Sequence, residues 1–481
     1  MKPIYSRRNF LKACGLATAA LCSDALRSAT IKVASPEVEY VLRGGQTYID
    51  GRWCSCDIGI TPRGRLVVSK SPIPCHYVIN VSGRVVSPGF IDILADNSAN
   101  PERTFLTFEK YKLGDGVATA LQMHGGATHA GDYYRHFSRE KHYVNWGVST
   151  KVMNLRYKYP VLASRLKAIE SSLEEGALGI SHSPEYHPDT TREELLAYAH
   201  LARKYERPLF LHTRYSCRDK ELLGVDEAIR LSHLTGCRVH IDHLNSTGGT
   251  FHMPEALKRI REARTSGLEI TTCVYPSSYW ATYLHSSRFT EGWQERYQIT
   301  YSDLEIVGTG ERLTEESFNR YRSQAGVLVA VRPGVQPMET TVRLALREDF
   351  CVIGSDGGIE KERCANNHPR GANCFASAIR YALDERIPLE KILDKMTTRS
   401  ARIIGFPMRG RGELRNGYIA DLTVFNPETI RGRATNANPC QFSEGIELVI
   451  VNGKIAFDRH RPTGEMNGTD IKYESITQLY Y

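Results

Sequence analysis

The chain of 481 residues has 41% hydrophobic and 24% charged residues, which are ordinary values for a globular protein. This composition excludes a disordered chain, a collagen-like repeat and a small disulfide-rich scaffold. The formal net charge is +8, and about half of it (+4) lies in residues 1–29. The remaining charge is small for this length and forms no basic run, which argues against a nucleic-acid-binding protein.

Residues 1–34 resemble a twin-arginine export signal. Arg7 and Arg8 precede Phe10-Leu11-Lys12, and a short, weakly apolar stretch follows at Ala13–Cys22. This stretch is far shorter than the roughly 20 residues that span a bilayer, and no other stretch reaches that length. We therefore expect no stable membrane span. The resemblance implies that the twin-arginine translocase exports the chain to the periplasm or otherwise out of the cytoplasm.

Twelve cysteines occur in the chain, and Cys54 and Cys56 form a Cys-x-Cys pair. Most of the others lie in or near expected strands, where cysteine usually behaves as a small buried hydrophobe. Export is compatible with disulfides, but the sequence alone assigns no pairing.

Both ends of the remaining chain consist of short apolar runs and turns. Residues 35–86 carry Gly44-Gly45 between such runs. Residues 409–481 contain Asn452-Gly453 directly after the apolar Leu448–Val451, which is a hairpin pattern. We expect the two ends to form one small β-sandwich domain.

Residues 87–408 alternate apolar strands with helical patterns, which is typical of a (β/α)₈ barrel of the TIM type. The expected strands are Pro88–Asp92, Ala118–Met123, Ala177–Ser181, Pro208–His212, Arg238–His243, Glu269–Val274, Val327–Val331 and Phe350–Asp356. The expected helices cover Leu162–Glu174, the segment from Thr191 to Leu201, Asp226–Thr235 and Glu255–Ser266. The aromatic, polar segment 278–324 is expected to be an insertion over the mouth of the barrel.

Polar residues end four of the apolar strand runs, at the carboxyl ends where barrel active sites form. They are His124, His212, His243 and Asp356. Three imidazoles and a carboxylate at one barrel mouth suit a divalent metal such as zinc, which acidifies a bound water. The carboxylate can take that proton and return it to a leaving amine. The pattern therefore predicts hydrolysis of an amide.

Seven motifs make the chain similar to the N-acyl-D-amino-acid deacylase (D-aminoacylase) branch of the amidohydrolase superfamily. In chain order they are Pro88-Gly89-Phe90-Ile91-Asp92, Glu175–Ser181 with Tyr186, His212-Thr213-Arg214, Asp242-His243, Val274-Tyr275-Pro276, Gly354–Gly357 and His368-Pro369-Arg370. The similarity covers nearly the whole mature chain. It implies a metal-dependent amidohydrolase acting on an N-acyl-D-amino acid or a related N-acyl compound, with His212 and His243 as metal ligands and Asp356 as the catalytic acid and base.

Two departures from the family pattern affect the metal centre. The family follows Pro-Gly-Phe-Ile-Asp with a His-x-His pair, whereas this chain has Leu94 and Asp96 at those positions. The bridging cysteine of the family maps to Gly125, next to His124. We hypothesise that His124 supplies a substitute ligand, which would give one zinc or other divalent ion on three imidazoles. A polar turn residue is the alternative interpretation of His124.

A third departure concerns the substrate. Asn245 stands where the family carries a lysine that helps to hold the substrate carboxylate. The loss of this cation puts recognition of a free amino-acid carboxylate in doubt. The candidate substrate-binding side chains are Tyr186, Arg214, Tyr275, Arg370, Asn245 and Asp96.

Two other functions remain open at this stage. A dihydroorotase- or hydantoinase-like hydrolase of cyclic amides uses the same scaffold, but that class often uses a carboxylated barrel lysine, and no lysine ends an expected strand. The missing His-x-His pair favours a catalytically silent, exported binding protein. Such a protein has no physical need for His212, His243 and Asp356 together.

Overall fold

The computed structural model describes residues 37–96, 101–361 and 367–474. From Val38 onward the chain forms one compact unit, and the expected export signal lies outside the described residues. Among the described helices, none is long and apolar enough to cross a membrane.

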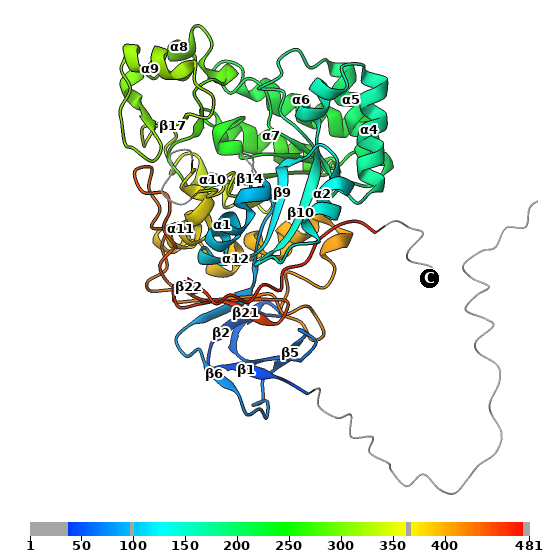
Figure 1. The fold of residues 1–481 in the computed structure, drawn as a ribbon, viewed down its shortest axis with the longest axis vertical. Coiled ribbons are helices and arrows are strands. Elements are labelled where there is room, and N and C mark those ends of the chain that lie inside the picture. The colour runs from blue at the N-terminus through cyan, green and yellow to red at the C-terminus, as the bar shows by residue number, and fades with distance from the viewer. Residues whose placement is uncertain (1–36, 97–100, 362–366, 475–481) are drawn as a thin grey trace, which may run out of the picture. The chain divides into compact units, whose positions relative to one another are not determined.

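Eight parallel strands form the curved sheet at the centre of the fold (Figure 1). In chain order and in neighbour order they are β8 (Phe90–Asp92), β9 (Val117–Ala127), β10 (Asn145–Lys151), β11 (Ile180–His182), β12 (Leu209–Leu211), β13 (Val239–Ile241), β14 (Ile270–Val274) and β18 (Cys351–Ile353). Buried apolar side chains from several of these strands meet in one cluster, among them Ile91, Leu121, Phe210 and Val352. The predicted (β/α)₈ barrel is thereby confirmed.

The seam between the first and last strands is closed by a buried ionic network. Ala95 bridges to Gly357 just beyond the two strands. From the following helix, the Lys112 ammonium donates to Asp92 Oδ2 at 2.9 Å, to Ser355 Oγ at 2.8 Å and to the Gly357 carbonyl at 2.8 Å. Asp92 also accepts the Ser355 backbone N–H at 3.1 Å. The network therefore ties β8 to the segment that follows β18.

Helices connect the strands and surround the sheet, as the amphipathic patterns predict. They are α1 (Pro101–Gly114), α2 (Ala130–Phe137), α3 (Val152–Lys158), α4 (Leu162–Glu174), α5 (Arg192–Lys204), α6 (Glu221–Thr235), α7 (Met253–Thr265), α10 (Val342–Ala345), α11 (Arg370–Asp384), α12 (Leu389–Met396) and α13 (Thr398–Ile404). The expected start at Thr191 is confirmed, because Thr191 and Glu194 form a capping box at the start of α5.

The sequence analysis misplaced one barrel strand. The segment Val327–Val331 is not in the barrel: β17 (Leu328–Val331) is the central strand of a separate antiparallel sheet. The missing barrel strand is β10, whose sequence NWGVSTK mixes polar and apolar residues. Its polar side chains find buried hydrogen-bond partners, as Asn145 does with Thr119, so no apolar run marks the strand.

The insertion forms a small three-stranded unit with its own apolar cluster. It contains β15 (Ala281–Tyr283), α8 (Trp293–Tyr297), β16 (Leu304–Ile306), α9 (Glu315–Arg322) and β17. The aromatic rings of Trp280, Phe289, Trp293 and Phe318 pack together in that cluster. The aromatic residues that mark the predicted insertion in the sequence therefore form its core. The unit also extends to β17, beyond the predicted limit at residue 324.

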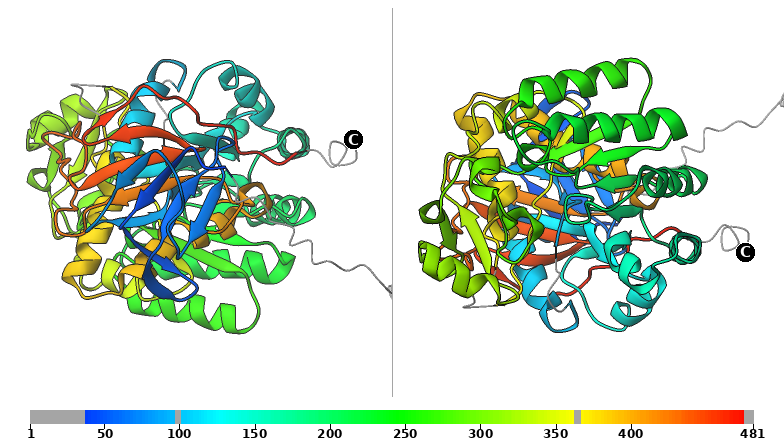
Figure 2. Two further views of the ribbon diagram at one scale, coloured as in Figure 1. Left: turned by 90° about the horizontal axis from the view of Figure 1, so that it is seen from below. Right: turned by 90° about the horizontal axis from the view of Figure 1, so that it is seen from above.

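Strands from both ends of the chain share one sheet, as Figure 2 shows where blue and orange strands lie together. That sheet runs β22 (Arg461–Pro462), β21 (Lys454–Asp458), β20 (Ile446–Val451), β19 (Leu422–Phe425), β7 (Val85–Pro88), β2 (Gln46–Ile49) and β3 (Arg52–Ser55). A second sheet runs β5 (Leu66–Ser69), β4 (Asp57–Ile60), β1 (Tyr40–Arg43) and β6 (Val78–Asn80). One apolar cluster joins the two sheets through residues such as Ile58 and Val424. Asn452-Gly453 forms the expected hairpin between β20 and β21.

Candidate active site and metal centre

Three histidines from three barrel strands converge at one point. His124 lies within β9, His212 follows β12 and His243 follows β13. Each offers a ring nitrogen, and the three nitrogens lie within 4.8 Å of one another. Residues as far as 119 positions apart in the sequence (243 − 124) therefore face a common centre, and His124 is a strand residue rather than a turn residue.

Two of the imidazoles are oriented by hydrogen bonds on one side. His124 Nδ1 lies 2.7 Å from Asp242 Oδ2, and His243 Nδ1 lies 3.1 Å from Ser246 Oγ. Both contacts use Nδ1, so Nε2 is the nitrogen on the other side of each ring. Hydrogen-bonded carboxylates behind histidine ligands are a common second layer of metal sites.

The surroundings of the His212 ring indicate whether the three imidazoles can bind a metal ion. This ring is buried, yet among the described residues neither Nδ1 nor Nε2 has a hydrogen-bond partner. Burying an imidazole whose nitrogens make no hydrogen bond costs free energy, unless a metal ion accepts the lone pair of one nitrogen. Three imidazoles with an open position are a suitable donor set for zinc or a similar divalent ion, once the metal has displaced the proton of His124, so these residues can hold such an ion.

Asp356 lies beside this centre with its backbone in the left-handed region, at φ 48°. Its Oδ2 atom lies 3.7 Å from His243 Nε2. Arg370 pairs with the same carboxylate, and its Nε donates to the Asp356 carbonyl oxygen at 2.9 Å. The neighbours Ser355 and Gly357 are held by the Lys112 network, so both flanks of this residue are fixed.

Burial and charge set opposite protonation states within this cluster. Burial lowers the pKa of His243 to about 3 and the pKa of His212 well below its ordinary value. Burial also lowers the pKa of His124, but the hydrogen bond and charge of Asp242 outweigh it and raise the value to about 9. Burial raises the pKa of Asp356, but its interactions with the His243 imidazole and with the positively charged Arg370 outweigh this effect, so the net shift is downward. Asp356 is thus held ionised.

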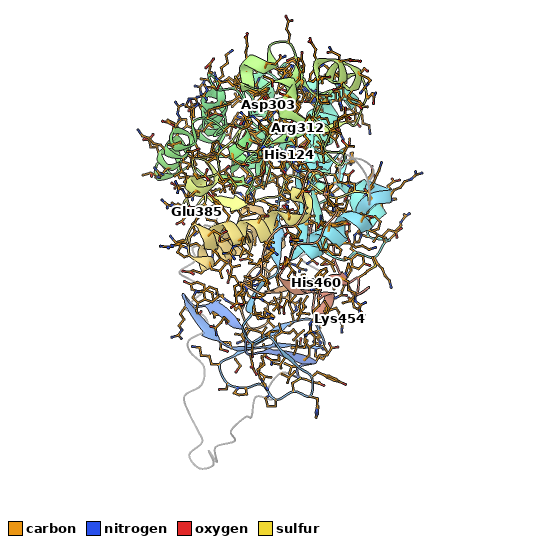
Figure 3. The ribbon with its side chains drawn as sticks, turned by 90° about the vertical axis from the view of Figure 1, so that its left-hand side faces the viewer. His124, Asp303, Arg312, Glu385, Lys454 and His460 are labelled. Carbon is orange, nitrogen blue, oxygen red and sulfur yellow. The ribbon has the colours of Figure 1, made fainter. Side chains whose placement is uncertain are left out.

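A cavity of about 390 Å³ opens over the histidines. Its walls come from the barrel mouth and from the insertion, and they include Asp96, His124, Tyr186, His212, His243, Tyr275, Trp280, Tyr283, Arg288, Asp356 and Arg370. In Figure 3 His124 lies at the barrel end nearest Asp303 and Arg312 of the insertion, away from Lys454 and His460 of the β sheets. The site therefore occupies the mouth that the insertion covers.

Three of the predicted substrate-side residues line this cavity with polar atoms. The Tyr186 ring lies 4.9 Å from the His212 ring, and its hydroxyl lies 3.2 Å from Thr282 Oγ1. The Tyr275 hydroxyl and Asp96 Oδ1 are buried without a hydrogen-bond partner among the described residues. A methyl group added at Gly125 would lie 2.8 Å from Asp96 Oδ1, so this carboxylate fills the space that a side chain at 125 would take.

Two other predicted residues do not reach the cavity. The Arg214 guanidinium points to Glu227 Oε2 at 2.9 Å and to carbonyl oxygens, so the structure gives it a structural role. Asn245 is buried and donates to the Tyr275 carbonyl at 3.0 Å. Both residues follow a metal-ligand candidate closely in the sequence, but their hydrogen bonds hold the side chains away from the cavity.

The sequence analysis missed Arg288, which the insertion supplies. This arginine lines the cavity and is buried, with Nη2 donating to Ser216 Oγ at 3.0 Å and to the Ser246 carbonyl at 2.8 Å. Its Nε has no hydrogen-bond partner among the described residues. An irregular insertion gives no register from which to place one arginine, so the sequence offered no signal for it. Asp242 was visible as a charged residue at the end of an apolar strand.

The barrel also has a lysine that the sequence analysis overlooked. Lys151 ends β10, the strand that was not predicted. It is absent from the described lining of the cavity, which contains no lysine. A carboxylated lysine of the cyclic-amide hydrolases therefore has no counterpart among those lining residues.

Comparison with known proteins finds deacylases and also dihydroorotases and hydantoinases. Residues 311–457 match the sequence model of the amidohydrolase family. The chain is 27% identical over 484 residues to an N-acyl-D-glutamate deacylase and to a D-aminoacylase, both of Alcaligenes xylosoxydans xylosoxydans. Each alignment covers 89% of this chain and 96% of the relative.

The fold is shared with a solved structure as well. An N-acyl-D-glutamate deacylase of Bordetella bronchiseptica, solved with zinc and a phosphonate inhibitor, superposes with a TM-score of 0.76 at 22% identity. The superposition covers 91% of this chain and 100% of that chain.

Removing the carboxylate behind His124 should weaken metal binding. In the Asp242→Asn variant we expect the zinc affinity at high pH to fall about 10- to 100-fold, because the imidazole loses its orienting acceptor. Protons compete with the metal for His124, whose pKa is about 9, so affinity rises with pH up to that value. The variant should shift this rise to lower pH. Competition with a chelator measures both effects. The control is Asp219→Asn, an exposed carboxylate on the loop between β12 and α6, which should change neither.

Removing the cation beside Asp356 should change the pH profile. The predicted role of Asp356 as the base needs its ionised form, so we expect activity above its pKa and a loss of activity as pH falls through it. In Arg370→Gln we expect the acid limb of kcat/KM to move to higher pH. Arg214→Gln, which removes a buried arginine outside the cavity, should leave the midpoint of that limb in place. An unchanged limb in Arg370→Gln would contradict the assigned ion pair.

Proposed function

We propose that this chain, a member of the D-aminoacylase branch of the amidohydrolase superfamily, is a divalent-metal-dependent hydrolase that removes the acyl group from an N-acyl-D-amino acid. The observation that carries the proposal is the convergence of three imidazoles with Asp356 at 3.7 Å from His243. We further propose one zinc ion per chain, because Leu94 is buried in the apolar cluster of the barrel and offers no second set of ligands.

In this proposal, different residues bind the metal and transfer the proton. His124, His212 and His243 would hold the metal, which when bound polarises the acyl carbonyl and acidifies a water molecule. Asp356, kept ionised by His243 and Arg370, accepts the proton of the attacking water. The protonated carboxyl then donates to the departing nitrogen. Its fixed backbone keeps the carboxylate close to the metal side of the cavity.

Two arginines of the cavity offer donors to an anionic substrate, although Arg370 pairs with Asp356 and Arg288 Nε lies 3.8 Å from Glu185 Oε1. Arg288 and Arg370 both line the cavity, and each keeps one buried N–H without a hydrogen-bond partner among the described residues. Free guanidinium donors pair well with carboxylates. Arg288 thus supplies a cation that the change to Asn245 had put in doubt. The acidic substrates named for two relatives, N-acyl-D-glutamate and N-acyl-D-aspartate, agree with a second carboxylate on the amino acid.

The experiment is an assay of free amino-acid release by the zinc-loaded protein. We expect hydrolysis of N-acetyl-D-glutamate or N-acetyl-D-aspartate, weaker action on N-acetyl-D-leucine, and little action on L-enantiomers or on a hydantoin. Asp356→Asn should lower kcat by about 10²- to 10⁴-fold, because it removes the proton acceptor. Elemental mass spectrometry should find about as much zinc in the variant as in the parent.

Three outcomes would overturn the proposal. Ring opening of the hydantoin without release from any open-chain amide would favour the cyclic-amide alternative. Near-normal turnover by Asp356→Asn, with zinc bound, would remove the assigned base. A protein that takes up no zinc after reconstitution, and hydrolyses nothing in the panel, would favour a binding protein instead.

We also propose export of the folded chain through the twin-arginine translocase to the periplasm, on the strength of Arg7 and Arg8 and the residues that follow them. Replacing both arginines by lysine keeps the charge but removes the paired guanidinium groups. We expect this variant to stay in the cytoplasmic fraction of a host that exports the parent chain. Equal export of both chains would contradict the proposal.

A further inference from the structure

Two cysteine sulfurs outside the barrel lie unusually close together. Cys54 lies in β3 and Cys56 directly follows that strand, and their Sγ atoms are 2.8 Å apart. Extended backbone places residues i and i+2 on the same side of a strand, so the arrangement follows from the Cys-x-Cys spacing. The Thr47 hydroxyl, on the paired strand β2, lies 3.4 Å from Cys54 Sγ.

The separation decides between two uses of the pair. Two thiolates on one tetrahedral zinc ion, each at about 2.3 Å, would lie roughly 3.8 Å apart. A disulfide needs about 2.05 Å. The observed 2.8 Å is already shorter than a shared metal allows and lies within about 0.8 Å of a bond. The geometry therefore favours a covalent link over a metal.

We propose that Cys54 and Cys56 form a reversible dithiol–disulfide couple that exchanges with low-molecular-weight disulfides. Cys54 is half-buried and Cys56 is buried, so an external disulfide meets Cys54 first. A link across three residues closes a very short loop and constrains the unfolded chain less than a long one. The couple is therefore a redox site rather than a staple for the fold.

The exchange with oxidised glutathione proceeds in two balanced steps. The Cys54 thiolate attacks one glutathione sulfur, forming a mixed disulfide and releasing one glutathione thiolate. The Cys56 thiolate then attacks Cys54 Sγ, closes the Cys54–Cys56 bond and releases the second glutathione. The protein loses two protons and two electrons, and oxidised glutathione becomes two reduced molecules. Reduced glutathione reverses both steps.

The test uses the intact chain and one tryptic peptide. Trp53–Arg63 contains both cysteines and no other. The protein is equilibrated with mixtures of oxidised and reduced glutathione, quenched with acid, alkylated in denaturant and digested. We expect the peptide to change from two alkyl groups to none, with the loss of two hydrogens, as the oxidised fraction rises.

Single variants separate the two steps. In Cys56→Ser the second step cannot occur, because no thiolate is available to attack Cys54 Sγ. Cys54 should therefore retain one glutathione. In Cys54→Ser the folded protein should show neither a ring nor an adduct, because the buried Cys56 remains. A parent peptide that carries two alkyl groups at every mixture overturns the couple, as does an equal adduct on both variants. None of these masses depends on hydrolytic activity, so the result is independent of the proposed function.

Discussion

The Lys112–Asp92 ion pair is the constraint on which the barrel and its site both depend. Both side chains are almost fully buried, at 1% and 0% exposure, and they join the strand that opens the barrel to the segment after the strand that ends it. Breaking such a pair leaves an uncompensated buried charge, which costs about 3–5 kcal/mol. The same ammonium donates to Ser355 Oγ and to the Gly357 carbonyl oxygen, on either side of Asp356. The hydrogen bonds that close the barrel therefore also position Asp356.

The protonation states of the site residues follow from their burial and from the charges around them. Burial alone makes His212 and His243 neutral, which is the form that binds a metal. Asp356 stays ionised only because cations surround it, and Arg370 is the one that pairs with it directly. The site thus combines neutral donors with an ionised base at one barrel mouth, a division of roles that amide hydrolysis requires.

Two neighbouring segments, the one that follows β8 and the strand β9, shape the site around His124. Leu94 joins the apolar interior, while Asp96 places a carboxylate oxygen where a side chain at position 125 would be. His124, one residue before that glycine, turns toward His212 and His243 with Asp242 behind it. The two segments therefore meet beside Gly125.

Local chemistry and spacing were enough to predict the strand ends that carry His212, His243 and Asp356, the helix start at Thr191 and the hairpin at Asn452. The remaining features depend on contacts between segments that are far apart in the chain. The strand β10 belongs to the barrel because it pairs with β9, although it has no apolar run. The strand β17 has an apolar run but pairs with β15 in a separate sheet. Arg214 turns away from the cavity and Arg288 enters it, because the direction of a long side chain is set by distant partners that no local pattern encodes.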